Sequence, residues 1–465
     1  MNKFILAHFF ILFCIADCTA QQPGQKIFTL EEFIGQVKEF HPLAKQADIQ
    51  IDKALAELQI AKGAFDPAIE LDASRKSFDG KNYYYYTNPQ LTVSLPVGNI
   101  KTGIENNGGE LLSPEITKGK SSYLGVELPL IKGLLLDNRR AILQQAKILR
   151  SQSEQERALM FNNLLFDANV AYWQWAATYQ QLIAYSKFLD VAAERMRLVR
   201  IAFINGDRAM ADTVEAYAQI QNYQLLKAEA LLKFNNAKLE MANYLWLENY
   251  RGYLLPNDYI PDNLELFVNS PFKNIDELLA LSSNQNPLLQ IYNFKLSSLE
   301  VERKLKFQSL LPDFSVKANL LNKDYYSLKN LSSNYLENNY KWGIDFKFPL
   351  FLREARGNYK KTQLTIKETN LEMINKRQET ENKIRSYFTE FYALVGQLET
   401  SKNIFENYKS LLRTEELKFA QGESSLFFVN SREARLIEIL QKQIELSFKC
   451  YKAKYAMEWA AGILK

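Results

Sequence analysis

Apolar residues recur at a seven-residue spacing through the middle of this 465-residue chain. Apolar side chains at that spacing form one stripe on an α-helix and are typical of helices that supercoil against neighbours. The pattern predicts a first long helix from about Arg139 to Phe203. Its stripe consists of Phe161, Ala168, Trp175, Leu182, Leu189, Met196 and Phe203, and a companion row begins three residues later at Leu164.

The stripe occurs a second time near the end of the chain, as Ile384, Phe391, Leu398, Phe405, Leu412 and Phe419. Ile384 lies 216 residues after Ala168, and every later member keeps that offset from its counterpart. A second long helix is therefore predicted from about Arg356 to Phe419. Because two such rows stay in register, the pattern indicates an internal structural repeat.

Both predicted long helices end at a similar turn, which reads Phe203-Ile204-Asn205-Gly206 in the first copy. The second copy reads Phe419-Ala420-Gln421-Gly422. Glycine at this place supplies the left-handed conformation that commonly ends an α-helix. A return helix is expected after each turn, from about Asp212 to Trp246 and from about Phe428 to Ala461.

Other segments alternate between apolar and polar residues, which predicts strands with one apolar and one polar face. They are Ile69–Ser74, Gln90–Val97, Leu124–Leu130, Phe314–Leu320 and Trp342–Leu350. Strands of this kind build membrane barrels with a wet interior, although any one of them also fits a soluble sheet packed on helices. Tyrosines at strand ends or in loops fit an aromatic belt at the lipid surface: Tyr83 to Tyr86, Tyr325, Tyr326, Tyr335 and Tyr340.

We expect four spanning strands per chain, which is too few to close a barrel. Because lipid does not tolerate an open sheet edge, a barrel would have to be shared between chains. The offset between the copies is 245 residues at Pro42 and Pro287 but 216 at the turn glycines. Most of the extra residues of the first copy lie between Asn82 and Ser121, and they form either an extra hairpin or an external loop.

The first twenty residues have the pattern of a secretory signal peptide. Lys3 precedes an apolar run from Phe4 to Ile15, and the segment ends with the small residues Cys18-Thr19-Ala20. A lipid anchor on Cys18 is the less favoured alternative, because Asp17 stands where lipoprotein signals carry a small residue.

The expected organisation has four parts. They are a signal peptide at 1–20, a first repeat at 21–249 with membrane strands at about 68–130, a connecting segment at 250–274, and a second repeat at 275–465 with membrane strands at about 313–350. Three prolines, Pro256, Pro261 and Pro271, interrupt helical continuity in the connecting segment.

Composition narrows the class of function. The 47% apolar content excludes a disordered chain, while a mean hydropathy of -0.27 excludes a membrane protein built of many spanning helices. The net charge of +4 arises from 57 basic and 53 acidic residues, so nucleic acid is not expected as a partner.

Cleavage at the predicted site would leave Cys450 and His41 as the only cysteine and histidine. We therefore expect no catalytic, cofactor or metal site built on these residues, and no HExxH, GxSxG or GxGxxG motif occurs. A secreted enzyme that uses paired carboxylates remains an alternative, because Asp and Glu are plentiful.

The order of these parts resembles the TolC family of outer-membrane efflux proteins, over nearly the whole chain after the signal. The resemblance rests on the duplicated helix–hairpin–helix units, the matched Phe-x-x-Gly turns and a strand-to-helix junction. That junction runs from Gly125-Val126-Glu127-Leu128-Pro129-Leu130 through Gly133-Leu134-Leu135-Leu136-Asp137 to Arg139-Arg140.

The resemblance implies a mixed, mainly α fold, in which three chains form a 12-strand β-barrel in the cell outer membrane, continued by a long periplasmic α-helical barrel. Such a homotrimer contacts outer-membrane lipid, has no enzymatic activity and needs no cofactor. It docks on a periplasmic adaptor (a membrane fusion protein) that joins it to an inner-membrane pump. It would pass small molecules or polypeptides outward in a tripartite efflux or type I secretion system.

The resemblance also assigns roles to residues at the two turns. Asn205, Gly206, Gln421 and Gly422 would form the periplasmic tips that contact the adaptor.

The periplasmic gate is expected just beyond these turns. Family members carry gating aspartates six and nine residues after the second glycine, where this chain has Phe428 and Ser431, whereas Asp212 and Glu215 occupy these offsets in the first copy. Phe428 is expected to form a constriction that gates by dewetting, or alternatively to pack between helices. Asp212 is expected either at the gate or as a helix cap.

One further alternative is a periplasmic coiled-coil scaffold or adaptor without a pore. It accounts for the seven-residue spacing and the export signal, but it leaves the alternating strands and the duplicated architecture unexplained.

Overall fold

The computed structural model describes residues 26–262, 274–323 and 338–464, and the chain divides into two compact units. The tip unit comprises Met1–Pro42, Leu164–Pro271 and Tyr387–Ala456. The sheet unit comprises Leu43–Asn163, Phe272–Ser386 and Met457–Lys465. The predicted signal peptide and residues 263–273 of the predicted connecting segment lie outside the described residues.

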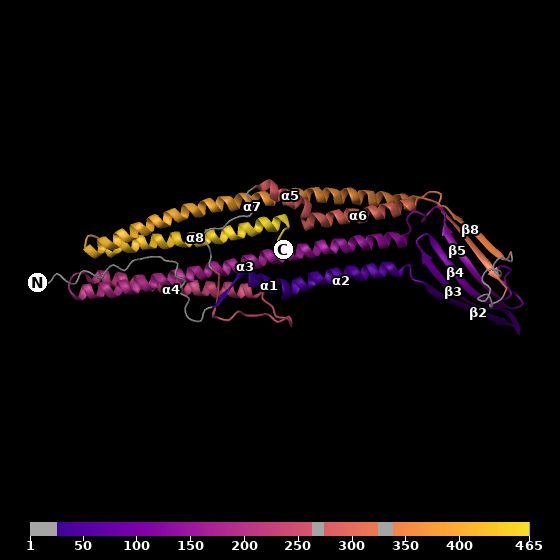
Figure 1. The fold of residues 1–465 in the computed structure, drawn as a ribbon, viewed down its shortest axis with the longest axis horizontal. Helices are drawn as coiled ribbons and strands as arrows, with labels where there is room; N and C mark the ends of the chain where they lie inside the picture. Colours follow the sequence, from indigo (N-terminus) through magenta and orange to yellow (C-terminus); the bar gives the residue numbers. More distant parts are fainter. Residues whose placement is uncertain (1–25, 263–273, 324–337, 465) are drawn as a thin grey trace. The chain divides into compact units, whose positions relative to one another are not determined.

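The sheet unit contains one antiparallel sheet, whose strands lie side by side in the order β2-β3-β4-β5-β7-β8 (Figure 1). The strands are β2 (Ala68–Phe78), β3 (Lys81–Leu95), β4 (Gly98–Gly108), β5 (Gly119–Pro129), β7 (Asp313–Asn322) and β8 (Tyr340–Lys347).

The sheet therefore has six strands, whereas four spanning strands were expected per chain. The segment between Asn82 and Ser121, which the sequence left open as hairpin or loop, contains β3 and β4. These two strands pair with each other and with β2 and β5, so the hairpin lies inside the sheet.

The tyrosine prediction is corrected in part. Tyr83 to Tyr86 lie within β3 rather than at a strand end, because the ladder between β2 and β3 extends through Tyr84 to Tyr86. Tyr340 is the first residue of β8, as expected. Tyr325, Tyr326 and Tyr335 lie outside the described residues.

The long helices α3 (Asn138–Ile204) and α7 (Arg353–Gln421) begin and end within three residues of the predicted positions. Each starts in the sheet unit and continues into the tip unit. The return helices α4 (Met210–Ala242) and α8 (Leu426–Ala461) are also present. No helix in the described part of the chain combines the length and the apolar character needed to cross a membrane.

Two pairs of shorter helices precede the strands. Helices α1 (Leu30–Phe40) and α5 (Ile275–Gln285) are 11 residues long, and α2 (Pro42–Gly63) and α6 (Pro287–Gln308) are 22 residues long. The Thr29 side chain caps α1, and Asn274 and Asn286 cap α5 and α6. Such caps satisfy backbone N–H groups that the first helical turn leaves without partners.

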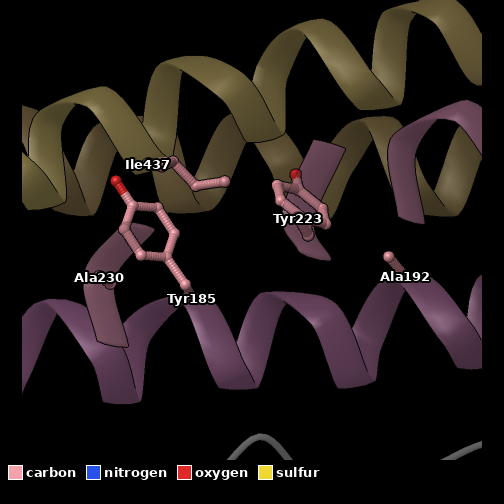
Figure 2. Packing of buried hydrophobic residues seen from close by; sticks show 5 residues of the cluster. All are labelled: Tyr185, Ala192, Tyr223, Ala230 and Ile437. Atoms are coloured by element: carbon pink, nitrogen blue, oxygen red, sulfur yellow. The ribbon is translucent and has the colours of Figure 1, made fainter. Parts of the chain in front are cut away.

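One part of the core of the tip unit lies between α3, α4 and α8. Figure 2 shows Tyr185 of α3, Tyr223 and Ala230 of α4 and Ile437 of α8 gathered between these helices, with Ala192 further along α3. A buried row of α4 has a seven-residue spacing and contains alanine at every position except one tyrosine, and small side chains of this kind allow close packing against α3. This row is Ala216, Tyr223, Ala230 and Ala237.

The start of the described chain is tied to the region after α4. Strand β1 (Lys26–Phe28) pairs in parallel with β6 (Tyr259–Pro261). The buried Tyr172 hydroxyl donates to the Phe28 carbonyl oxygen at 2.8 Å and accepts from the Asp262 N–H at 3.0 Å. Segments that are distant in sequence therefore meet on one face of α3.

His41 occupies the junction between α1 and α2 and is only 7% exposed. Its ring stacks on Tyr244 at 5.9 Å and meets Trp246 edge-on at 6.1 Å between centroids. Burial lowers the pKa of the His41 imidazole below 6.5, although a backbone hydrogen bond with Asn243 opposes this shift. The folded protein therefore favours the neutral ring.

The free energy of unfolding should fall as the pH drops below about 6.5, because the unfolded chain binds a proton at His41 more readily than the folded chain does. Replacing His41 by Gln should flatten this part of the pH dependence, as measured by urea unfolding between pH 7 and pH 5. If the free energy of unfolding falls equally with pH in both proteins, protonation of His41 does not contribute to this pH dependence.

Candidate functional site

The two turns of the tip unit share one geometry. Gly206 and Gly422 both have φ of 83°, in the left-handed region that favours glycine. In the first turn, the N–H groups of Gly206 and Asp207 donate to the carbonyl oxygens of Phe203 and Ala202. Gly422 and Glu423 repeat this pattern with Phe419 and Lys418, so each long helix ends in a Schellman motif.

The residues predicted as adaptor contacts are exposed at these turns. Asn205 and Gly206 follow α3, while Gln421 and Gly422 stand at the end of α7. The Arg208 guanidinium, close to the first turn, donates to the Phe419 carbonyl oxygen at 2.6 Å and lies 4.1 Å from the centre of the Phe419 ring. The two turns are therefore linked within the chain.

The predicted gate residues lie in the first two turns of α4 and α8. Asp212 is the third residue of α4, whose N-cap residue is Ala209, so Asp212 is not the cap. Its carboxylate still lies near the positive end of the helix dipole. Glu215, one turn later, accepts a hydrogen bond from the Asn430 amide of α8 at 3.0 Å. This hydrogen bond connects Glu215 to α8.

Phe428 is 53% exposed and Ser431 is also exposed. The Phe428 ring meets the neighbouring Phe427 ring edge-on, with 5.7 Å between centroids, and Phe427 is 63% exposed. Two large apolar side chains therefore reach solvent on the surface of a single chain.

Sequence reasoning missed a buried polar cluster one to two turns further along the helices. The Arg195 guanidinium of α3 donates to both carboxylate oxygens of Glu433 of α8, each at 2.9 Å. The Glu433 side chain is 1% exposed and that of Arg195 is 12% exposed. The Tyr223 hydroxyl of α4 donates to Glu433 at 2.7 Å, so one carboxylate connects three helices.

Two further residues complete this Arg195 cluster, which consists of Arg195, Tyr223, Glu416, Asn430 and Glu433. Glu416 of α7 lies 3.5 Å from Arg195, and the Asn430 amide oxygen lies 3.4 Å from it. Burial by itself would lower the pKa of Arg195, but the hydrogen bonds and charge of Glu433 outweigh this effect and raise it. Burial, followed by the charge of Glu433, raises the pKa of Tyr223.

A sequence signal for this cluster did exist. Glu433 stands between Val429 and Leu436, which are 1% and 5% exposed, on the buried stripe of α8. A charge on an apolar stripe requires a partner when it is buried. The sequence alone could not identify Arg195 as that partner, because the pairing depends on how α3 meets α8.

The sheet has two chemically distinct faces. On one face, large apolar side chains are exposed: Ile69 82%, Leu71 65%, Trp342 65%, Ile344 53% and Phe346 65%. The opposite face carries ion pairs across β4, β5, β7 and β8. Lys101 pairs with Glu127 at 2.8 Å, and Lys317 pairs with Glu127 at 3.7 Å and with Asp345 at 2.6 Å.

Within the ranges that the structure describes, no three His, Cys, Asp or Glu side chains gather in an arrangement that could hold a metal ion. The thiol of Cys450 is fully buried, and burial raises its pKa to about 11. A thiol with this environment is poorly reactive toward aqueous reagents.

The sequence matches no family model and no curated protein. The fold, in contrast, matches solved outer-membrane channels. The open state of the Neisseria gonorrhoeae MtrE outer membrane channel has a TM-score of 0.66 and 15% identity, with 93% of this chain and 88% of that chain covered. The chain has the fold of the TolC family.

Two further solved structures are similar to this chain in fold. The outer membrane protein VceC from Vibrio cholerae has a TM-score of 0.64 and 13% identity, covering 93% of this chain and 95% of that chain. The Campylobacter jejuni CmeC outer membrane channel has a TM-score of 0.62 and 15% identity, covering 93% and 85%. At these identities the likeness concerns the backbone and not individual side chains.

Replacing Arg195 by Ala should lower the free energy of unfolding by about 3–5 kcal/mol, because the buried Glu433 carboxylate loses its charged partner. The double variant Arg195→Met with Glu433→Leu should lose less, because neither charge remains buried. Thermal unfolding in detergent measures both changes.

Arg197 provides the control, because it lies on the same helix and pairs with Glu194 at 2.6 Å, yet both side chains are more than half exposed. Arg197→Ala should change stability little. Equal losses for Arg195→Ala and Arg197→Ala would contradict the assignment of the Arg195 cluster as a buried structural link.

Proposed function

We propose that this protein is a non-enzymatic export channel of the outer membrane. The observation that carries the proposal is the two-faced sheet of the sheet unit. Its exposed apolar face suits lipid acyl chains, and its face of paired charges suits a water-filled lumen. The TolC-family fold supports the same function.

Three copies of the chain form the channel. Strands β2 and β8 are the outer strands of the sheet, and among the residues that the structure describes neither has a second strand beside it. Unpaired strand edges are not tolerated in lipid, so β2 of one copy pairs with β8 of the next. The barrel of the assembled homotrimer closes in this way.

The helices of the tip unit extend into the periplasm, where Asn205, Gly206, Gln421 and Gly422 contact a periplasmic adaptor. The adaptor joins the channel to an inner-membrane pump, as in tripartite efflux or type I secretion. The cargo is a small molecule or a polypeptide. These roles rest on the shared fold and on the exposure of the two turns.

The gate lies at the start of α4 and α8, among Asp212, Glu215, Phe428 and Ser431. Phe428 supplies an apolar constriction, because it is exposed on the single chain and lies beside the second exposed ring of Phe427. Apolar rings of this kind close a pore by excluding water. Glu215 is held at its place by Asn430.

The alternative of a periplasmic scaffold without a pore retains one supporting observation, the seven-residue spacing of buried residues. It assigns no role to the exposed apolar face of the sheet. A scaffold in water would expose Ile69, Leu71 and Trp342 at considerable cost.

Single-channel recording in a planar bilayer, with the oligomeric mass measured on the same detergent-extracted sample, tests the proposal. We expect trimers with small, discrete conductance, and we expect Phe428→Ala to raise the resting conductance because a narrow apolar ring is removed. A monomer without conductance would instead support the scaffold.

Phe427→Ala is the matched control, since it removes an equally large, exposed ring at the neighbouring position. If Phe428→Ala leaves the conductance of an active trimer unchanged, Phe428 is not the constriction. If both substitutions raise the resting conductance equally, the constriction involves both rings at the start of α8 and not Phe428 alone.

A further inference from the structure

We infer that the β3–β4 hairpin forms part of the membrane wall, so that a trimer closes a barrel of 18 strands. This inference rests on the proposed channel function and deepens it. Three copies of a six-stranded sheet supply 18 strands, whereas the four strands expected per chain gave 12. The inserted hairpin is neither an external loop nor a plug.

The hydrogen-bonding register supports this position. The hairpin pairs with β2 on one side, from Ala68↔Thr92 to Phe78↔Lys81, and with β5 on the other, from Asn99↔Glu127 to Asn107↔Gly119. These ladders extend over nearly the full length of the strands. A loop lying outside the barrel would leave β2 and β5 to pair with each other.

The apolar face of the sheet continues through the hairpin in the two rows nearest its short turn. On the apolar face, one row across five neighbouring strands reads Val93, Ile100, Val126, Ala318 and Trp342. A second row reads Ile69, Leu91, Thr102, Leu124, Leu320 and Tyr340. Because a one-residue slip would reverse the faces, this agreement fixes the hairpin in the same register as the other strands.

The polar face is connected in the same way. Lys101 of β4 pairs with Glu127 of β5, and the Tyr123 hydroxyl of β5 donates to the Gln90 side chain of β3 at 2.5 Å. The Ser121 hydroxyl donates to Glu105 at 3.0 Å. The hairpin therefore contributes charged and polar groups to the lumen side.

The short turn of the hairpin is anchored at the helix end of the sheet. Arg139, at the start of α3, donates to the Asn99 side chain at 3.1 Å and to Asp137 at 3.2 Å. Its guanidinium also lies 5.6 Å from the centre of the Phe65 ring, just after α2. One arginine thus ties the hairpin to the chain between α2 and β2 and to the start of α3.

An even number of strands in each chain allows the copies to close an antiparallel barrel. Because neighbouring strands alternate in direction through all six positions, β8 runs opposite to β2, and the next copy can continue the sheet in antiparallel fashion. Barrel diameter grows roughly in proportion to strand number, so 18 strands give a barrel about one and a half times as wide as 12. Barrels of this strand number leave an aqueous channel.

Site-directed nitroxide labelling of the trimer in lipid tests the inference. Single cysteines at Val93 and Ser94 in β3 are compared with cysteines at Val316 and Ser315 in β7, which are equally half-buried Val and Ser neighbours. The nitroxide collides often with oxygen where it faces lipid, and often with a water-soluble nickel complex where it faces water. We expect Val93→Cys and Val316→Cys to favour oxygen, and both serine sites to favour nickel.

The labelled pair in β3 and the labelled pair in β7 distinguish a failure of the hairpin inference from a failure of the channel proposal. If Val316 and Ser315 alternate but Val93 and Ser94 both favour nickel, the channel stands and the hairpin is not part of the wall. If neither pair alternates, the channel proposal itself fails. The buried Cys450 should remain unlabelled. A trimeric mass measured on the same sample would show that three chains with six strands each supply the 18 strands of the barrel.

Discussion

The structure depends on the alternation of apolar and polar side chains along six paired strands. Each pleated strand directs neighbouring residues to opposite faces, so one face exposes Ile69, Leu71 and Trp342 while the other carries Glu127 with two lysine partners. No single solvent satisfies both faces. In the proposed channel, lipid contacts the apolar face, water contacts the charged face, and further copies of the chain pair with the outer strands β2 and β8.

The helices of the tip unit depend on a second periodic pattern. Apolar rows at a seven-residue spacing let α3 and α7 pack against their return helices, and left-handed glycines end both long helices. Where the four helices meet near the turns, the buried carboxylate of Glu433 joins α3, α4 and α8. A buried charge is costly unless it is paired, so this site favours one arrangement of the helices over others.

Much of this fold could be predicted from the sequence, because its signals are long and periodic. The stripe from Phe161 to Phe203 located the end of α3 closely, and alternation located parts of β2, β3, β5, β7 and β8. Whether the residues from Asn82 to Ser121 form an extra hairpin or a loop was left open, because this segment mixes tyrosine, glycine and asparagine and its pairing depends on neighbouring strands. The link from Arg195 to Glu433 spans 238 residues, and no local pattern specifies it.

Contact between the apolar face of the sheet and lipid is the central claim, and Trp342 reports on it directly. Trp342 is 65% exposed on β8, whereas the other four tryptophans, Trp173, Trp175, Trp246 and Trp459, lie outside the strands. The measurement is the tryptophan fluorescence of the protein in vesicles with brominated acyl chains and in ordinary vesicles. We expect bromine to quench part of the fluorescence, and Trp342→Phe to remove that part. Equal fluorescence of the wild-type protein in both lipids would contradict the account.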